Sequence, residues 1–415
     1  MVLTDLQDNK QRNQILLLYI STICGVLLGV LASIVNTRFL SPADYGDVRY
    51  VQNIINFIVS LLIFGYFLSG SRLIALSNNK IYSRRVKGMM VIILLFCCTM
   101  LVLGLLICYL FHFNTPKTAT LFLISLPVCF SPLLLNYIEQ TTIGDNQIGR
   151  LSLTRILPYL LYVPIAYFVY RQFGATSTKM ILLQWGIYTF VYVCIILSTK
   201  PLFSKLKGIW TELQKENHNY GIQLYIGSLV MVATNYLAGI SLGYFNTDNS
   251  EVGFYTLALT VTTPLATLPT IVGTAYFKKF TTQSRIPSKV IWLTIIITAI
   301  TCIGFLLLIH PMVKFLYTEK YAIVATYASL LAIGFCIHGL GDVFNRYLCS
   351  QGKGTEIRNA SIINGVVKVT GYMLLVALFN TNGAIATTIL ADLVYFITML
   401  YYYYRFIRRN TESEH

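Results

Sequence analysis

The chain has 415 residues, of which 56% are hydrophobic and 11% are charged, whereas ordinary soluble domains carry about 25% charged residues. This composition excludes most soluble folds, because so few charged residues could not cover so much apolar chain, and it excludes intrinsic disorder, which requires low hydrophobicity and high charge. The net charge of +15 leaves two interpretations, nucleic-acid binding or the excess of Lys and Arg in the cytoplasmic loops of a membrane protein.

Twelve apolar runs follow one another along the chain, each close to the 20 or so residues that a membrane-spanning helix needs. The first run follows a polar start and lacks a signal-peptide cleavage pattern, so we expect it to remain as a helix. We predict an all-α integral membrane protein of twelve transmembrane helices, with a six-helix lobe at 1–200, a cytoplasmic linker at 201–219 and a second six-helix lobe at 220–415. The predicted helices are centred near residues 25, 57, 100, 129, 160, 188, 232, 264, 299, 332, 368 and 394.

The distribution of Lys and Arg predicts the side of the membrane on which each connection lies. If the N-terminus is cytoplasmic, the cytoplasmic segments hold 23 of these residues and the outer segments hold 7. Because Lys and Arg favour cytoplasmic loops, we predict that both termini are cytoplasmic. The asymmetry accounts for most of the net charge and removes the reason to expect nucleic acid as a partner.

Three glycine-containing segments of the first half recur in the second half at nearly one spacing. The pairs are Gly46/Gly253, Gly144/Gly352 and Gly174/Gly383, with offsets of 207, 208 and 209 residues. Since six helices return the chain to its starting side, the two halves would share one orientation. Parallel repeats of this kind are a transporter architecture, with the substrate path between the halves.

Four segments carry a resemblance to a known family: FLSPADYG at 39–46, EVGFYTLALTVTTPLATLP at 251–269, SQGKGTEIR at 350–358 and FNTNGAIATT at 379–388. With them the chain resembles the Wzx-type flippases of O-antigen and capsular polysaccharide repeat units, members of the multidrug/oligosaccharidyl-lipid/polysaccharide exporter superfamily. The resemblance implies a MATE-like fold, in which two six-helix lobes surround a central cavity that opens to one side of the membrane at a time.

The resemblance also implies a substrate and a location. The substrate would be an oligosaccharide linked to undecaprenyl diphosphate, moved from the cytoplasmic to the outer leaflet of the bacterial inner membrane. Besides the membrane lipids, a polysaccharide polymerase and a chain-length regulator are the partners that it suggests.

Two ionisable residues lie near the middle of the last two predicted helices. Lys368 and Asp392 enter from opposite sides and reach a similar depth, so we expect them to form an ion pair. Ionisable groups within a membrane are functional candidates because burying them is costly. We therefore expect Asp392 to bind H⁺ or Na⁺ and to release Lys368 toward the diphosphate, with a static ion pair between the lobe's helices as the alternative.

Further charged candidates lie toward the predicted cytoplasmic side. Asp342 and Arg346 are four residues apart and are expected to pair along one helical face. Glu139 has no such partner in the sequence and is expected near the mouth of the cavity. Arg72 is expected either to bind the diphosphate, because guanidinium binds phosphate in a bidentate manner, or to anchor its helix at the membrane surface.

Two more groups complete the candidate residues. Arg38, Asp44, Asp47 and Arg49 cluster at the predicted outer end of the first two helices, where we favour a gating salt-bridge cluster over a sugar site. The amides of Asn56 and Asn235 are expected to line a cavity that accepts sugars, or to bond neighbouring helices.

No sequence feature indicates an enzyme, a resident cofactor or a metal site. The chain has no P-loop, its five histidines lack metal-ligand spacing, and its nine cysteines lie almost entirely in apolar runs. The short outer loops argue against a polymerase or ligase that acts on lipid-linked sugars. A drug or cation antiporter of the same fold remains the alternative to the flippase.

Overall fold

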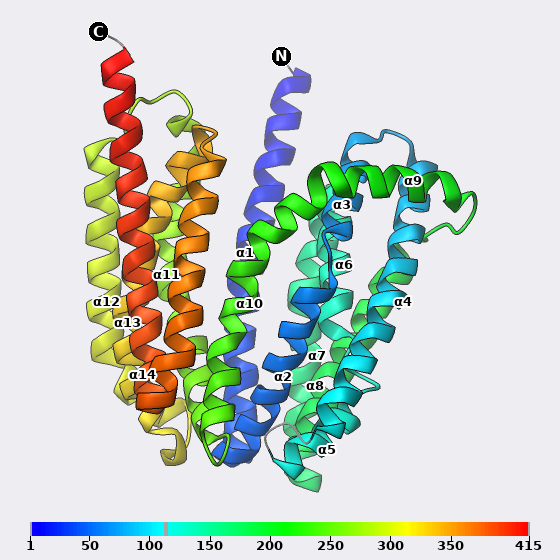
Figure 1. Ribbon diagram of the computed structural model, residues 1–415, viewed down its shortest axis with the longest axis vertical. Coiled ribbons are helices and arrows are strands. Elements are labelled where there is room, and N and C mark those ends of the chain that lie inside the picture. The colour runs from blue at the N-terminus through cyan, green and yellow to red at the C-terminus, as the bar shows by residue number, and fades with distance from the viewer. Residues whose placement is uncertain (1, 112–114, 414–415) are drawn as a thin grey trace. The chain divides into compact units, whose positions relative to one another are not determined.

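The computed structural model describes residues 2–111 and 115–413, and every element within these ranges is helical (Figure 1). The helices of the first half are α1 (Val2–Phe39), α2 (Pro42–Leu62), α3 (Tyr66–Leu76), α4 (Lys80–Leu110), α5 (Pro116–Ser125), α6 (Ser131–Gly144), α7 (Ile148–Phe173) and α8 (Ser177–Ser198). Those of the second half are α9 (Leu206–Glu216), α10 (Ile222–Phe245), α11 (Ser250–Phe280), α12 (Ser288–Leu316), α13 (Ile323–Ser350) and α14 (Gly354–Ser413).

The predicted helix positions agree with these elements. All but one of the predicted centres lie within a described helix, and the exception, residue 129, falls in the break between α5 and α6. Pro127 lies in this break and Pro132 lies in the first turn of α6, as expected of a residue that cannot donate a backbone hydrogen bond inside a helix. α14 contains two helices joined at Asn380, whose φ of 50° interrupts the helical backbone.

The chain forms two compact units. The first comprises Met1–Leu40 and Val51–Leu229, and the second comprises Ser41–Tyr50 and Val230–His415. The residues that were predicted as a linker, 201–219, thus belong to the first unit, where they form α9 and the start of a π-helical turn at Asn217–Gly221. The beginning of α2 belongs to the second unit.

Eight helices of the described chain are long and apolar enough to cross a membrane, or nine if α2 and α3, which are bent by 58°, form one span. The chain is therefore an integral, multi-pass membrane protein. The predicted count of twelve stays a prediction, because it also requires α5 with α6, α10 and each half of α14 to cross.

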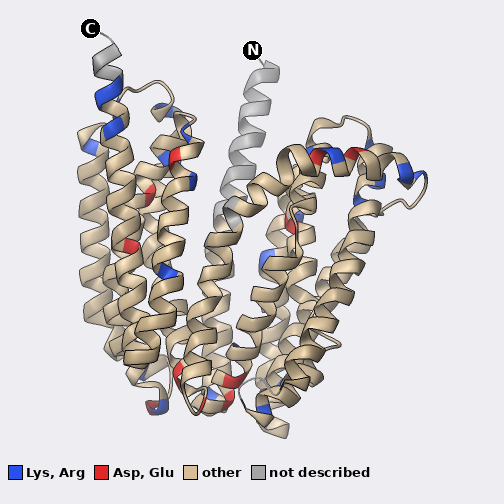
Figure 2. Ribbon diagram, viewed as in Figure 1, with Lys and Arg blue, Asp and Glu red and all other residues tan. Residues whose placement is uncertain are grey.

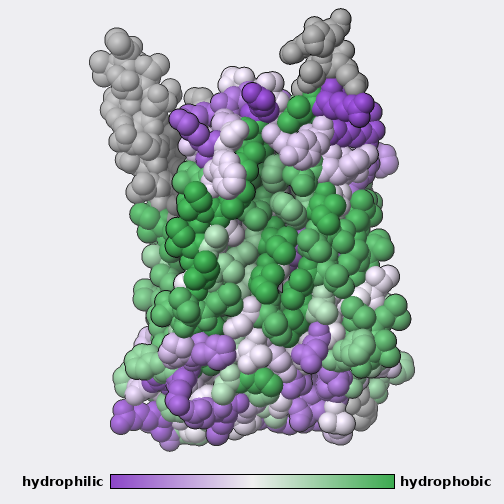
Figure 3. All heavy atoms as spheres, turned by 90° about the vertical axis from the view of Figure 1, so that its left-hand side faces the viewer, coloured by the Kyte–Doolittle hydropathy of each residue, from purple (hydrophilic) through white to green (hydrophobic). Residues whose placement is uncertain are grey.

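The surface of α12 has the character of a lipid-facing helix. Trp292, Ile296, Ile300, Ile303 and Leu307 recur at intervals of three and four residues and are all more than half exposed, so they form one apolar stripe. Figure 3 shows a broad hydrophobic band between hydrophilic ends on the face that it presents. Figure 2 shows the charged residues gathered mainly toward the ends of the helices, as a membrane-embedded protein requires.

Within the second unit, α13 packs against α11, α12 and α14. At one end of this bundle, Phe280, Tyr347 and Tyr403 form an aromatic core, with ring centroids 5.6 Å apart for the first two and 5.3 Å for the last two. Tyr403 also accepts a hydrogen bond from the backbone N–H of Ile286. These contacts fix the helices that carry the cavity described below.

Two of the repeated glycines contact one another. Gly46 lies in the first turns of α2 and Gly253 in the first turn of α11, and a methyl group added at Gly253 would lie 3.1 Å from the backbone nitrogen of Gly46. A methyl group added at Gly46 would overlap the backbone carbonyl of Asn249. The starts of two corresponding helices therefore pack backbone to backbone inside the second unit.

Candidate functional site

The second unit encloses a polar cavity of about 660 Å³ between α10, α11, α13 and α14. Its lining combines acidic and basic side chains with tyrosines, amides, other hydroxyls and apolar groups. The acidic and basic side chains are Lys368, Asp392, Asp342, Arg346 and His338. A cavity with convergent polar groups inside an apolar helical unit is the usual form of a binding site.

Each of four helical segments contributes a polar stripe to this cavity. The members of a stripe are three, four or seven residues apart, so they lie on one face of their helix. They are Thr263, Thr267 and Thr270 of α11; His338, Asp342 and Asn345 of α13; and, in the two halves of α14, Ser361, Asn364 and Lys368 and then Thr388, Asp392 and Tyr395. The sequence thus builds the polar lining by helical periodicity.

Asp392 is buried, with 4% of its surface exposed, and it pairs with His338. Its Oδ1 lies 3.0 Å from Nδ1 of His338, and the imidazole stacks on the ring of Tyr395 with centroids 4.5 Å apart. The stacking holds the imidazole in the orientation that points Nδ1 at the carboxylate.

Lys368 forms a different contact: its Nζ donates a hydrogen bond to Oδ1 of Asn235 on α10, at 3.0 Å. The predicted ion pair between Lys368 and Asp392 is therefore wrong, although both side chains line the same cavity. The physical reason is that His338 of α13 lies within hydrogen-bond distance of the carboxylate, and Asn235 of α10 supplies an acceptor for the ammonium.

Asp342 accepts hydrogen bonds from Oγ1 of Thr270 at 2.7 Å and from the hydroxyl of Tyr395 at 2.8 Å. Tyr395 in turn accepts from Nδ2 of Asn345 at 2.7 Å. Among the described residues no ion pair joins Asp342 to Arg346, so the predicted pairing is wrong. The carboxylate is satisfied by neutral donors on neighbouring helices.

The other candidates toward the predicted cytoplasmic side belong to the first unit. Glu139 lies 4.0 Å from Arg155, and both side chains are about one-third exposed. Arg72 pairs with Glu216 and lies 4.6 Å above the ring of Tyr220, so it holds the segment after α9 against α3. Its predicted role in binding a diphosphate stays a prediction.

Asn56 of α2 is half-buried, and the described residues provide no hydrogen-bond partner for its side chain. Asn235 of α10, in contrast, lines the second-unit cavity and binds Lys368. The two amides that the sequence singled out thus lie in different units.

The predicted outer cluster is divided between the units. Arg38 lies in the last turn of α1 in the first unit, whereas Asp44, Asp47 and Arg49 lie in the part of α2 that belongs to the second. Asp44 accepts a hydrogen bond from the hydroxyl of Ser41.

The other two members of the cluster bind within the second unit. Asp47 accepts from Nδ2 of Asn249 at 2.8 Å, and Arg49 lies 4.8 Å above the ring of Tyr45. The bond between Asp47 and Asn249 attaches the start of α2 to the turn before α11, whereas the contact of Arg49 with Tyr45 lies within α2. The expected gating function stays a prediction.

Sequence reasoning missed His338 and Tyr395, two of the side chains that contact the cavity carboxylates. A lone histidine and a lone tyrosine in apolar runs gave no signal by themselves. The signal that would have found them is the polar stripe, since His338 is four residues from Asp342 and Tyr395 is three residues from Asp392.

The fold resembles that of solved membrane transporters. A structure of a multidrug resistance MATE family transporter of the MOP superfamily in an inward-facing conformation matches with a TM-score of 0.73 and 14% identity, over 94% of this chain and 96% of that one. The lipid II flippase MurJ in an inward closed conformation matches with a TM-score of 0.72 and 14% identity, over 93% of this chain and 87% of that one.

A MOP superfamily transporter from Pyrococcus furiosus, described as having a binding pocket of reverse polarity that suggests a different function, matches with a TM-score of 0.61 and 13% identity, over 95% and 94% of the two chains. The fold is therefore that of the MOP-superfamily membrane transporters, and these three neighbours are transporters or flippases rather than enzymes.

The sequence comparison identifies the family. A family model described as polysaccharide biosynthesis protein matches residues 12–281, more than half of the chain. The chain belongs to this family. No curated protein sequence matches it.

Proposed function

We propose that the chain is a flippase that moves an undecaprenyl-diphosphate-linked oligosaccharide from the cytoplasmic to the outer leaflet of the bacterial inner membrane. The observation that carries the proposal is the combination of polysaccharide-family membership with a transporter fold. Two six-helix lobes would alternate in access to the two sides of the membrane, with both termini cytoplasmic. The product would serve O-antigen or capsular polysaccharide assembly, with a polymerase and a chain-length regulator acting afterwards.

The chemistry of the second-unit cavity supports a phosphorylated, sugar-containing substrate. Lys368 and Arg346 provide cations for a diphosphate, and guanidinium is suited to bidentate contact with phosphate. Asn345 and Asn364, with the threonines of α11, provide donors and acceptors for sugar hydroxyls. In this proposal Lys368 exchanges its bond to Asn235 for one to the substrate.

Ion coupling would act through Asp392. A proton or Na⁺ on this buried carboxylate competes with His338, so its arrival would free the imidazole and change the charge of the cavity wall. We place the coupling step at this pair rather than at Lys368, since His338 is the partner that Asp392 contacts.

A drug or cation antiporter is the second candidate. Two observations favour it: the similarity of the fold to a multidrug resistance MATE transporter, and the two carboxylates, Asp342 and Asp392, in the cavity. A cationic compound would pair with these carboxylates, whereas a diphosphate would be repelled by them.

The test is to delete the gene in the native host and to extract the lipid-linked sugars from each leaflet. A flippase predicts that the completed oligosaccharide accumulates on the cytoplasmic leaflet and that surface polysaccharide is lost. The parent chain and the variant K289A, which removes an exposed lysine outside the cavity, should restore transport, whereas K368A should not. Normal surface polysaccharide with new sensitivity to cationic compounds would instead establish the antiporter.

A further inference from the structure

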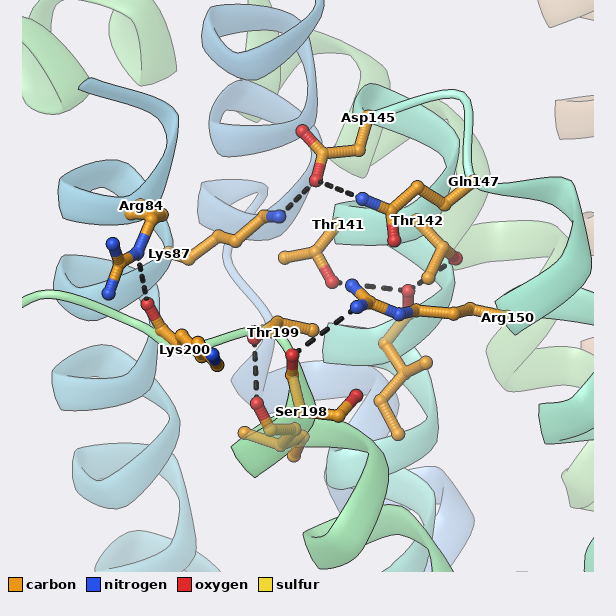
Figure 4. Close-up of polar contacts among 12 residues, drawn as sticks. Arg84, Lys87, Thr141, Thr142, Asp145, Gln147, Arg150, Ser198, Thr199 and Lys200 are labelled. Carbon is orange, nitrogen blue, oxygen red and sulfur yellow. Dashed lines mark hydrogen bonds and ion pairs between the residues drawn. The ribbon is translucent and has the colours of Figure 1, made fainter. Parts of the chain in front are cut away.

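A second polar cavity, of about 490 Å³, lies at one end of the first unit. It is formed where α4 and α7 begin and where α6 and α8 end, so four segments distant in the sequence meet there (Figure 4). Its lining includes five basic residues, namely Lys80, Arg84, Lys87, Arg150 and Lys200. We call this cavity the basic pocket.

Asp145 is the one acidic residue among the described residues that line the basic pocket, and it forms an ion pair with Lys87. The Lys87 side chain is only 4% exposed and pairs with Oδ2 of Asp145, which also accepts a hydrogen bond from Nε2 of Gln147 at 3.0 Å. Lys87 and Asp145 therefore neutralise each other within the lining of the basic pocket. Lys80, Arg84, Arg150 and Lys200 have no carboxylate partner among the described residues.

Two backbone carbonyls hold the arginines in place. Nε of Arg84 donates to the carbonyl of Lys200 at 2.7 Å, and Nη2 of Arg150 donates to the carbonyl of Ser198 at 3.3 Å. A guanidinium has five N–H donors, so each arginine keeps donors for a ligand after making its bond to the end of α8. Both groups are therefore oriented before any ligand arrives, as binding of a phosphate requires.

Four uncompensated positive charges around one cavity repel each other and attract an anion. Hydroxyl and amide groups, among them Ser77, Asn78 and Ser83, also line the basic pocket and can donate to anionic oxygens. The combination of lysine, guanidinium and hydroxyl donors matches a phosphate group.

Exposed apolar residues stand next in the sequence to three residues of this basic lining. Leu76 is 69% exposed beside Ser77, Ile81 is 53% exposed beside Lys80, and Leu197 is 66% exposed beside Ser198. A free inorganic phosphate would gain nothing from such residues, whereas the acyl chains of a lipid would cover them.

We infer that the basic pocket binds the phosphate headgroup of an anionic lipid, whose acyl chains lie along Leu76, Ile81 and Leu197. Basic pockets between transmembrane helices are suited to anionic lipid headgroups. The site lies wholly in the first unit and is separate from the second-unit cavity. It does not rest on the proposed function, because lipid binding is measured without transport.

The test measures binding of phosphatidylglycerol, labelled in its acyl chain, to the full chain in neutral detergent. The variant K80Q/K200Q removes two exposed charges whose side chains make no hydrogen bond or ion pair with described residues. The matched control K205Q/K207Q removes two exposed lysines from the neighbouring segment. We expect the pocket variant to weaken binding about 30-fold and the control to change it less than about threefold, with both variants eluting as the parent does in gel filtration.

Competition identifies the source of the phosphate. Unlabelled phosphatidylglycerol should displace the probe, whereas phosphatidylcholine and inorganic phosphate should not. A polyisoprenyl diphosphate that displaces the probe at far lower concentration than phosphatidylglycerol would keep the lipid-phosphate site and assign it to the transported lipid. Equal binding by K80Q/K200Q and its control, or full displacement by inorganic phosphate, would overturn the inference.

The variant R84Q/R150Q provides an independent check. Because both arginines also bind the end of α8, its unfolding temperature is measured with and without phosphatidylglycerol. We expect the lipid to raise the unfolding temperature of the parent and of K205Q/K207Q but not of R84Q/R150Q. An equal rise in all three proteins would contradict the assignment of the site to the basic pocket.

Discussion

The carboxylate of Asp392 lies in a position where ionisation without a partner is costly, since it is buried within a membrane-spanning bundle. His338 of α13 contacts this carboxylate, and the ring of Tyr395, one turn further along α14, stacks on the imidazole. Lys368 lines the same cavity but is held by Asn235. The two charged groups are therefore separate elements of the cavity wall.

A double-mutant cycle distinguishes these partners. Replacement of Asp392 by Ala should cost about 3 kcal/mol of unfolding free energy, because it leaves His338 without its buried partner. The coupling energy between D392A and H338A should be about 1 kcal/mol or more, whereas that between D392A and K368A should be below about 0.5 kcal/mol. The measurement is unfolding by SDS titration in mixed micelles, and stronger coupling to Lys368 than to His338 would contradict the structure.

Periodicity and depth arguments brought Lys368, Asp392, Asp342 and Arg346 forward as candidates, and all four line one cavity. Their partners could not be predicted in the same way, because a hydrogen bond between helices depends on rotation and packing that no single helix specifies. The same reason explains why the pair of Lys87 and Asp145, 58 residues apart, was not anticipated.

At the scale of elements, the start of α2 is packed tightly against the turn before α11. Asp47 binds the side chain of Asn249, and Gly46 lies against the backbone of the same residue. The backbone of Asn249 leaves no room for a larger residue at position 46. The proximity of the turn, and not the local sequence, is what requires glycine there.

Replacement of Gly46 by Ala should therefore destabilise the protein by about 3 kcal/mol or more, because the added methyl group must displace a backbone carbonyl. The matched control is G304A in α12, where nothing lies within 4 Å of the added methyl group. This control should stabilise the helix by about 0.5–1 kcal/mol, the usual advantage of Ala over Gly in a helix. Unfolding temperatures in detergent measure both changes, and equal values for the two variants would contradict the packing.

Helix α9 is attached to the first unit by a small set of contacts. The indole of Trp210 stacks on Tyr66 with ring centroids 5.7 Å apart, the hydroxyl of Tyr82 donates to Glu212, and Ile209 and Leu213 are buried. The sequence predicted a polar linker here. The apolar face of α9 makes it a docked helix instead.

Loss of the aromatic stack should loosen this helix. We expect W210A to increase the rate of trypsin cleavage after Lys205, Lys207 and Lys215 roughly fivefold, because a stacked aromatic pair contributes about 1 kcal/mol. The control W292A removes an indole from the exposed face of α12 and should leave that rate unchanged. Fragment sizes and rates are read by mass spectrometry, and equal rates for both variants would rule out docking through Trp210.

At the scale of the whole molecule, composition and hydrophobic periodicity were sufficient to predict an all-helical membrane protein, and all but one of the predicted helix centres lie within described helices. They did not predict that α2 and α3 would be bent by 58°, or that residues 41–50 would group with the second unit. Both features depend on contacts distant in sequence. Local patterns specify helices, whereas tertiary packing decides where a helix bends and which neighbours it joins.

The Lys and Arg asymmetry of 23 to 7 predicts a cytoplasmic C-terminus. Green fluorescent protein fused after His415 should therefore fluoresce, and alkaline phosphatase fused at the same position should be inactive. Fusions after Lys179, which is predicted to be external, should give the opposite pattern. An active phosphatase at the C-terminus would reverse the predicted orientation.

The contact between Gly46 and Gly253 has an evolutionary consequence. The two residues occupy corresponding positions of the repeat, and the structure brings them together. If the two halves descend from one ancestral gene whose product paired with itself, this contact was a residue touching its own copy, an isologous contact. A larger residue at that position would then have added a side chain on both sides of the contact at once.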